Sequence, residues 1–178
     1  RAFPSAVGGS SSSSGSPNTN GLGCAVVLGN NDVFPDYAVR LNDSSMFARQ
    51  AAAVAAACGL SASEAASFRR GGFYARGTAS GARLLVLNTG PYSSSAKAPP
   101  LNTTLQPDPY GQLAWLEAEL AGAARRGAQL LLLGHAPPTI DYFDRTSLWQ
   151  PSYAARYWSI LTRYRGAVAG QLYGHMHA

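Results

Sequence analysis

A run of four leucines between two helical segments constrains the fold of this chain more than any other feature. The run lies in "QLLLLG" at residues 129–134, and its uninterrupted apolar character predicts a fully buried strand. The preceding segment begins with Asp108 and Pro109, a favoured cap and a favoured first helical residue, and carries leucines at helical spacing. A second helical segment at 153–164 leads into a final strand, "AVAGQLYG", at 167–174. Strands that alternate with helices predict an α/β layered architecture.

The first half of the chain favours the same fold class. Ser61 is followed three residues later by Glu64, a capping-box pattern that predicts the start of a helix. Two apolar segments separated by "ASGA" predict a pair of neighbouring strands. The elements expected before Asp108, in chain order, are a buried strand at 24–28, a helix at 44–58, a second helix from Ser61, paired strands at 73–78 and 83–89, and a Pro/Ser loop at 90–107.

Length and composition indicate one domain. A chain of 178 residues with 46% hydrophobic and 13% charged residues is long enough for a single domain with a proper core. Residues 8–23 are low-complexity Gly/Ser sequence, which predicts a flexible loop insertion. We therefore expect two parts: residues 1–23 as a truncated start with this loop insertion, and residues 24–178 as the folded portion of a domain.

The charge pattern narrows the range of partners. The formal net charge of +5 favours anionic ligands such as phosphate esters. The basic residues are scattered, and only Arg69–Arg70 and Arg125–Arg126 are adjacent, so the sequence has no specific nucleic-acid-binding motif of the basic-cluster kind. No apolar run approaches the ~18 residues of a membrane span, so no transmembrane segment is expected.

The three histidines carry the strongest functional signal. His135 follows "LLLLG", and His175 and His177 follow "QLYG", so each lies just beyond a predicted strand and a glycine. Ligands of open α/β sheets bind at the carboxyl ends of the strands, where we expect these imidazoles to converge. The segment "GNND" at 29–32 is a fourth such strand end. The alternative is three histidines that are hydrogen-bonded within loops, while a compact structural zinc module does not fit the long spacing.

Convergence at this edge would assemble a metal site. If the strand direction persists past Gly174, His175 and His177 point to the same side. Imidazole is a common ligand of zinc and iron, and the amide oxygen of Asn30 can add a neutral ligand. The glycines before Asn30, His135 and His175 would let the backbone come close to the cluster.

Taken in order, these motifs resemble a known family. "GNND" at 29–32, "GHAPP" at 134–138 and "GHMH" at 174–177 are similar to motifs of the calcineurin-like metallophosphoesterases. The intervening "GGFYARG", "LLVLNT" and "DPYGQLAWLEAEL" resemble specifically the acid sphingomyelinase-like phosphodiesterase branch. The resemblance extends from Cys24 to His177. It implies a layered α-β-β-α sandwich, of which this chain would be incomplete at both ends.

The resemblance implies a site with two metal ions, usually zinc, that polarise a phosphoryl group and activate water. Asn30, His135 and His175 would bind one ion, and His177 the other. In this family a histidine commonly follows the metal-binding asparagine and protonates the leaving oxygen, but this chain has Asn31 there. An amide is not a general acid at ordinary pH, so the proton would come from water, another residue or the substrate.

The family pattern also requires acidic ligands that this sequence lacks. An Asp-x-His pair and a bridging aspartate should precede "GNND", yet residues 1–31 contain no Asp or Glu. Two cations without a bridging carboxylate would repel each other. We therefore expect an internal fragment of a larger phosphodiesterase that binds at most one metal weakly and has little turnover alone. Asp32 keeps a modest expected role, shaping the turn or supporting the ligands.

Three functions stay open at this point. The first is a metal-dependent phosphoric diester hydrolase similar to sphingomyelin phosphodiesterases, with transient membrane-surface contact if the substrate is a lipid. The second is an endopolyphosphatase-like hydrolase, because "GNND" resembles that branch and a phosphate leaving group has less need of a proton. The third is a non-catalytic binding protein that retains the fold. Tyr142, Phe143 and Trp149 either line an apolar surface of the loop at 136–150 or pack it down.

Two further features bear on the compartment. Cys24 and Cys58 are either a disulfide or two buried thiols. The sequons at Asn42 and Asn102 are candidate glycosylation sites. Together with the resemblance, these features favour a secreted protein or one of the lysosomal or vacuolar lumen.

Overall fold

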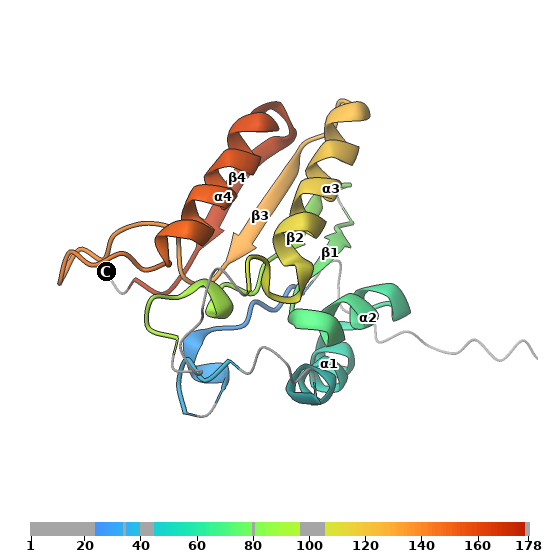
Figure 1. Ribbon diagram of the computed structural model, residues 1–178. Helices are drawn as coiled ribbons and strands as arrows, with labels where there is room; N and C mark the ends of the chain where they lie inside the picture. Colours follow the sequence, from blue (N-terminus) through green and yellow to red (C-terminus); the bar gives the residue numbers. More distant parts are fainter. Residues whose placement is uncertain (1–23, 34, 40–44, 80, 97–105, 177–178) are drawn as a thin grey trace, which may run out of the picture.

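The candidate site is built on a four-stranded sheet whose last three strands are parallel (Figure 1). The computed structural model describes residues 24–33, 35–39, 45–79, 81–96 and 106–176. The strands, hydrogen-bonded in this order, are β1 (Tyr74–Gly77), β2 (Arg83–Val86), β3 (Leu130–Gly134) and β4 (Val168–Tyr173). β1 and β2, the predicted pair of neighbouring strands, pair antiparallel, whereas β2, β3 and β4 pair in parallel.

Helices connect the parallel strands, as expected for crossover connections. The α-helices are α1 (Ser45–Cys58), α2 (Ala62–Gly71), α3 (Gln112–Arg125) and α4 (Pro151–Arg163). Four short 3₁₀ turns accompany them: η1 (Asn30–Asp32), η2 (Gly90–Tyr92), η3 (Pro109–Gly111) and η4 (Arg165–Ala167). α3 lies between β2 and β3 in the chain, and α4 between β3 and β4. The predicted mixed α/β class is confirmed.

The two faces of the sheet are covered by different helices. Leu85 and Leu132 belong to the core cluster formed with α3 and α4. Val86, which points to the other face of β2, belongs to the cluster formed with α1 and α2. Figure 1 shows α3 and α4 side by side in front of the sheet and α1 and α2 together below it. The described residues thus form one sheet with α3 and α4 over one face and α1 and α2 packed near β1 and β2, and the second sheet of the α-β-β-α sandwich stays a prediction.

The prediction of a fully buried strand at 129–134 is wrong in one respect. Leu130 and Leu132 are buried, whereas Leu131 and Leu133 are only half-buried. Successive side chains of a strand point to opposite faces. The face toward α3 and α4 is fully covered, but α2 packs chiefly against β1, further along the sheet.

The strand expected at 24–28 is also wrong, because this segment is extended but joins no ladder of the described sheet. The Tyr74 side chain instead forms hydrogen bonds with the Val26 backbone of this segment. The hydroxyl of Tyr74 accepts a hydrogen bond from the Val26 N–H at 2.9 Å and donates one to the Val26 carbonyl at 3.2 Å. One tyrosine therefore replaces the strand neighbour that the apolar sequence led us to expect.

The helix expected from Pro109 begins later than predicted. Pro109 opens a 3₁₀ turn, and Tyr110 and Gly111 have φ of +57° and +70°. These left-handed residues interrupt the helical path before α3 starts at Gln112. Asp108 still serves as the cap, since its carboxylate accepts the N–H groups of Leu113 at 2.8 Å and Ala114 at 2.9 Å.

The predicted elements between Ser44 and Gly72 are confirmed within a residue. α1 buries Phe47, Ala51, Val54 and Cys58, which lie at helical spacing along one face. At α2 the Ser61 hydroxyl accepts the Glu64 N–H at 3.3 Å, and the Ser61 N–H donates to the Glu64 carboxylate at 2.7 Å, which completes the capping box. Gly72 ends α2 with φ of +77°, a conformation that glycine adopts without strain.

Cys24 and Cys58 form a disulfide, which decides between the two alternatives for these residues. The bond joins the segment that leads to Asn30 to the last residue of α1. The Gly/Ser-rich sequence at 8–23 and the sequons at Asn42 and Asn102 lie outside the described residues. Among the helices described, none has both the length and the apolar character needed to cross a bilayer.

We predict that reducing this disulfide lowers the free energy of unfolding by roughly 3–4 kcal/mol, because the bond closes a loop with a sequence separation of 34. The measurement is urea unfolding, followed by circular dichroism, with and without reductant. A Cys24→Ala/Cys58→Ala variant is the control and should not respond to reductant. An unchanged unfolding midpoint for the reduced wild-type chain would contradict the prediction.

Candidate metal centre

The ends of β3 and β4 place two histidines on neighbouring strands. His135 follows β3 directly, and His175 follows β4 after one glycine. The Gly174 N–H donates a hydrogen bond to the His135 carbonyl at 3.0 Å, which continues the parallel pairing past both strand ends. The two imidazole rings lie edge to face, with their centroids 4.9 Å apart. The parallel sheet thus brings together residues that are 40 positions apart.

Asn30 reaches the same point from the other end of the chain. Its Oδ1 lies 2.8 Å from His135 Nε2, and His175 Nδ1 lies 3.1 Å from that same nitrogen. Asn30 begins the turn η1, which follows the extended segment. A Cβ on Gly29 would lie 3.2 Å from Cε1 of the His135 ring, so the glycine allows this close approach, as expected.

The three polar atoms form a donor set that fits one divalent cation. Ligand atoms that bind one ion through bonds of ~2.0–2.1 Å are separated from each other by roughly 3 Å. An in-plane imidazole nitrogen carries either one hydrogen or one lone pair, so Nε2 of His135 cannot pair fully with both neighbours. A cation would accept the lone pairs of Asn30, His135 and His175 together. One amide oxygen and two imidazoles suit zinc and similar ions.

The described site contains no carboxylate ligand. Within the ranges that the structure describes, no group of three or more His, Cys, Asp or Glu side chains has an arrangement that could hold a metal ion. The candidate centre therefore rests on the amide of Asn30 as much as on the imidazoles. This agrees with the lack of acidic residues before Asp32 in the sequence.

Asn31 lies beside the donor set and contacts Asn30. Its Oδ1 accepts a hydrogen bond from Asn30 Nδ2 at 3.0 Å, in an exposed position. With its nitrogen directed to Asn31, the Asn30 amide presents its oxygen to His135. Asn31 thus orients the proposed ligand, a contribution that the sequence did not indicate.

Asp32 shapes the turn, as expected. Its carboxylate accepts the Gly29 N–H at 2.6 Å, and its carbonyl accepts Gln50 Nε2 of α1 at 2.8 Å. These two bonds hold the turn closed and tie it to α1. Asp32 therefore supports the position of Asn30 through the backbone.

The strand direction does not persist past Gly174, which was the condition for placing His175 and His177 on the same side. β4 ends at Tyr173, and His175 has φ of +69°, so the extended path does not continue through this residue. The Met176 N–H instead donates to the Gly174 carbonyl at 2.8 Å, which makes a turn. The alternation rule that placed both imidazoles on one side does not apply here. His177 itself lies outside the described residues.

Tyr37 is a site residue that the sequence reasoning missed. Its hydroxyl lies 3.3 Å from His175 Nε2, the ring nitrogen that faces away from His135. Burial, followed by the charges of Asp36 and Asp141, raises the pKa of the Tyr37 phenol, so it stays protonated. When the phenol oxygen accepts the proton of Nε2, the lone pair of Nδ1 is left for the donor set. A tyrosine in a loop gives no sequence signal for such a role.

Similar proteins include several phosphodiesterases. "Sphingomyelinase phosphodiesterase D" of Dictyostelium discoideum is 33% identical over 162 residues, which cover 90% of this chain and 35% of that protein. "Sphingomyelin phosphodiesterase" of Bos taurus is 35% identical over 144 residues, or 81% of this chain and 21% of that protein. An "Endopolyphosphatase" of Cryptococcus neoformans is 36% identical over 67 residues, or 37% of this chain and 9% of that protein. No protein-family model matches the chain.

The ordered motifs and these matches agree. Over most of its length the chain is similar to part of two members of the sphingomyelin phosphodiesterase family. The resemblance predicted from "GNND", "GHAPP" and "GHMH" is thereby confirmed. The chain spans about a third of the length of the Dictyostelium member of this family and about a fifth of the bovine one, from the shares of 35% and 21%.

We predict that Tyr37→Phe changes the tautomer of His175. Loss of the phenol oxygen removes the acceptor at Nε2, so the proton shifts toward Nδ1, and zinc affinity falls by about tenfold. Two-dimensional ¹H–¹⁵N spectra of the imidazoles report the tautomer without metal, and calorimetry reports the affinity. Tyr142→Phe, at a tyrosine outside the donor set, is the matched control. Unchanged His175 nitrogen shifts in Tyr37→Phe would contradict the prediction.

Proposed function

We propose that this chain provides part of the active site of a metal-dependent phosphoric diester hydrolase. The observation that supports this function best is that Asn30 Oδ1 and His175 Nδ1, from two other segments, lie 2.8 and 3.1 Å from His135 Nε2. The relatives named as phosphodiesterases support the reaction class. The proposed enzyme is a hydrolase in its complete form.

Each residue has a distinct proposed role. Asn30, His135 and His175 hold one cation, zinc in our proposal, and His177 belongs to a second ion in the complete protein. Such ions supply Lewis-acid polarisation of a phosphoryl oxygen and activation of water. Asn31 donates a hydrogen bond from its amide to a phosphoryl oxygen. Because that amide releases no proton, the leaving group takes its proton from water or from the substrate itself.

The chain by itself is proposed to be inactive or nearly so. A second cation next to the first needs a carboxylate to offset their repulsion, and no carboxylate belongs to the described donor set. We propose that residues 24–178 form the C-terminal portion of a layered α-β-β-α domain and that acidic ligands come from elsewhere in the complete protein. The helix-covered sheet is compatible with one layer of that sandwich.

The proposed setting is a secreted one or the lumen of the lysosome or vacuole. Disulfides persist in oxidising compartments, and this chain joins Cys24 to Cys58. Glycosylation at Asn42 and Asn102 would fit the same compartments. The proposed substrate is a phosphodiester, and a lipid substrate would bring the protein to a membrane surface.

Two alternatives have support of their own. An endopolyphosphatase-like activity is favoured by Asn31, since a phosphate leaving group has little need of a general acid, and by the shorter match to an endopolyphosphatase. A binding protein that retains the fold without catalysis is favoured by the lack of a carboxylate in the described donor set. An Asp-x-His pair and a Gly-Asp motif shortly before Arg1 in the coding sequence would favour the enzyme over the binding protein.

We predict that the chain binds one zinc ion and that the donor set is responsible. His135→Ala and His175→Ala should each abolish measurable binding, because a single imidazole and an amide make a weak site. Asn30→Ala should weaken zinc binding by 10-fold or more, a loss on the order of 1.4 kcal/mol or more in binding free energy. Isothermal titration calorimetry measures both stoichiometry and affinity.

Asn31→Ala provides the matched control for the Asn30 variant. It removes a neighbouring amide that orients Asn30 but does not itself bind the cation, so its effect on zinc affinity should be clearly smaller than that of Asn30→Ala. Circular dichroism checks that each variant is folded. Equal zinc affinities for wild type, His135→Ala and Asn30→Ala would exclude the proposed centre.

We also predict that the 178-residue chain with zinc hydrolyses its substrates near the background rate. The assay compares a choline phosphodiester, a nucleotide phosphodiester and polyphosphate at saturating zinc, with equilibrium dialysis of the bound metal in parallel. The expected stoichiometry is one ion per chain. Two tightly bound ions together with efficient phosphodiester hydrolysis would show that the chain needs no further ligands, contrary to the proposal.

A further inference from the structure

The residue that follows the proposed ligand His135 is fixed through both of its backbone groups by buried side chains. The Ala136 N–H donates a hydrogen bond to the Thr89 hydroxyl at 3.0 Å, and the Ala136 carbonyl accepts one from the Trp149 indole N–H at 2.9 Å. Thr89 is 1% exposed and Trp149 is 0% exposed. We call Thr89 and Trp149 the backbone clamp. Its two residues come from separate segments, one after β2 and one just before α4.

Thr89 contacts the chain on both sides of His135. A Cβ on Gly134 would lie 3.0 Å from the Thr89 methyl group, so this methyl packs against the backbone just before the histidine. The Thr89 hydroxyl reaches the N–H just after it. The His135 carbonyl accepts the Gly174 N–H, which follows β4 on the other side of β3. The peptide unit between His135 and Ala136 is thus held by the segments that follow both neighbouring strands.

A side chain makes the bond to Ala136 because the backbone after β2 turns away from β3. The Leu87 N–H still donates to the Leu133 carbonyl at 2.8 Å. Thr89 has φ of −90° and ψ of −7°, which are not the angles of a strand, and the turn η2 begins at Gly90. The Thr89 hydroxyl therefore continues the contact with the segment after β3 where its own backbone has left the strand direction.

Thr89 follows a residue that a buried polar network holds in place. The Gln112 side chain accepts the Asn88 N–H and donates to the Asn88 carbonyl, both at 2.8 Å. The Asn88 side chain donates to the Gly71 carbonyl at 2.9 Å and accepts the Gly90 N–H at 3.2 Å. Asn88 and Gln112 are 4% and 2% exposed, so these bonds offset a desolvation cost. They tie the segment that carries Thr89 to the end of α2 and to the start of α3.

The same segment also holds Trp149. The ring of Trp149 packs against that of Tyr92, with centroids 4.7 Å apart. The Gln150 N–H donates to the Tyr92 carbonyl at 2.8 Å. Both residues of the clamp therefore belong to one packed unit.

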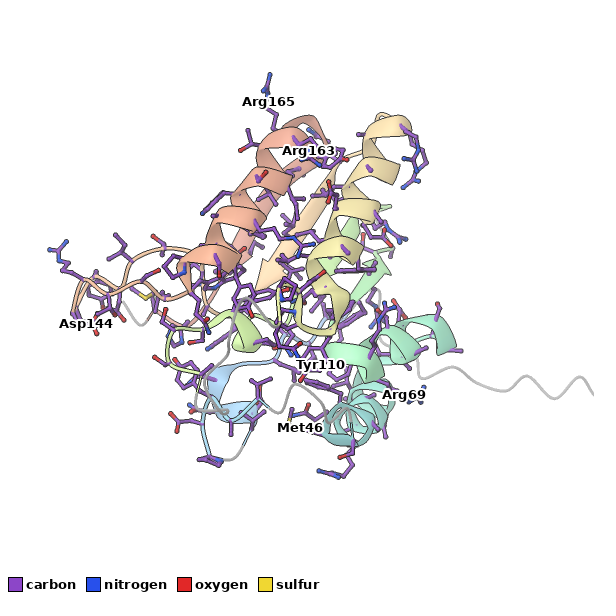
Figure 2. All side chains as sticks on the ribbon, viewed as in Figure 1. Met46, Arg69, Tyr110, Asp144, Arg163 and Arg165 are labelled. Carbon is purple, nitrogen blue, oxygen red and sulfur yellow. A yellow bond between two sulfur atoms is a disulfide. The ribbon has the colours of Figure 1, made fainter. Side chains whose placement is uncertain are left out.

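The clamp lies at the base of the loop between β3 and α4. Of the three aromatic residues noted in this loop, Trp149 packs it down, whereas Tyr142 and Phe143 are 47% and 76% exposed. Figure 2 shows Asp144, the next residue, at the outermost point of this loop, away from the sheet and its helices. The bond between Trp149 and Ala136 thus ties the two ends of the loop together in the core.

We propose that Thr89 and Trp149 are positioning residues for the candidate metal centre. By fixing Ala136 they hold the backbone of His135 where its imidazole meets the other two donor atoms. The role toward a metal ion rests on the function proposed above, whereas the fixed backbone is a property of the metal-free chain.

The position of His135 matters more than that of the other two ligands. Its Nε2 is the atom that both Asn30 Oδ1 and His175 Nδ1 approach, at 2.8 and 3.1 Å. A shift of its backbone would therefore change both distances at once. Ligands that are held in place before the ion arrives lose less conformational freedom on binding, which raises affinity.

The test compares two substitutions that separate the shape of Thr89 from its hydrogen bond. Thr89→Val keeps the branched shape and removes the acceptor, so zinc affinity should fall about tenfold, as expected for a group that orients a ligand. Thr89→Ser keeps the hydroxyl and removes the methyl group, so it should lower the urea midpoint and keep zinc affinity within about twofold of wild type. Calorimetry measures affinity, and near-ultraviolet circular dichroism checks the fold. Thr146→Val, which removes an exposed threonine hydroxyl of the same loop, is the matched control.

Nuclear magnetic resonance of the metal-free chain tests the fixed backbone directly. In the wild-type chain the Ala136 amide hydrogen should exchange as slowly as the amides of β3, because its acceptor is buried in the core. Thr89→Val should move the imidazole resonances of His135, and Thr89→Ser should leave them in place.

The outcomes separate the clamp from the proposed metal function. Zinc binding that is weakened in Thr89→Val and kept in the less stable Thr89→Ser supports the clamp. Unchanged affinity in Thr89→Val, or equal losses in Thr89→Ser or Thr146→Val, overturns it. If Thr89→Val does not fold, the wild-type Ala136 amide decides: slow exchange supports the clamp and fast exchange overturns it. If the wild-type chain binds no zinc, the proposed function is rejected, and the His135 resonances of the Thr89 variants decide whether the clamp stands.

Discussion

The parallel pairing of β3 with β4 is the interaction on which the candidate site depends. It places the ends of two strands side by side at one edge of the sheet, and the bond from the Gly174 N–H to the His135 carbonyl continues that pairing into the site. Gly134 permits this packing, because a Cβ there would lie 2.5 Å from the ring of Tyr173. α3 and α4 bury one face of the sheet, and the parallel hydrogen bonds of β3 and β4 hold the two histidines in a fixed relation.

The third proposed ligand depends on restraints that lie outside the sheet. Asn30 follows a segment without ladder bonds, and that segment is fixed by the Cys24–Cys58 disulfide and by the hydroxyl of Tyr74. Asp32 then closes the turn. In the candidate metal centre, His135 and His175 are thus held by the parallel strands, whereas Asn30 is held by the disulfide and by hydrogen bonds outside the sheet. Loss of the tether should affect Asn30 more than the histidines.

Much of the fold could be predicted because the signals were local. The capping box at Ser61 and Glu64 and the apolar stripe of α1 depend on residues within a few positions of each other, and the structure has both helices. The strand expected at 24–28 failed because apolar character does not show which group pairs with the backbone, and of this segment only Leu28 is buried. The start of α3 failed because Tyr110 adopts a left-handed conformation, in which its ring packs against Phe47 of α1 at 5.2 Å.

The sequence by itself determined the fold class, the resemblance to the family and the placement of His135 and His175 beyond strand ends, since these follow from periodicity and from ordered motifs. Only the tertiary structure decided that Asn30 meets both histidines, that Tyr37 contacts His175, and that Phe143 projects while Trp149 is buried. The physical reason is distance along the chain. Contacts between residues separated by 105 or 138 positions depend on how the layers pack, and no local pattern records that packing.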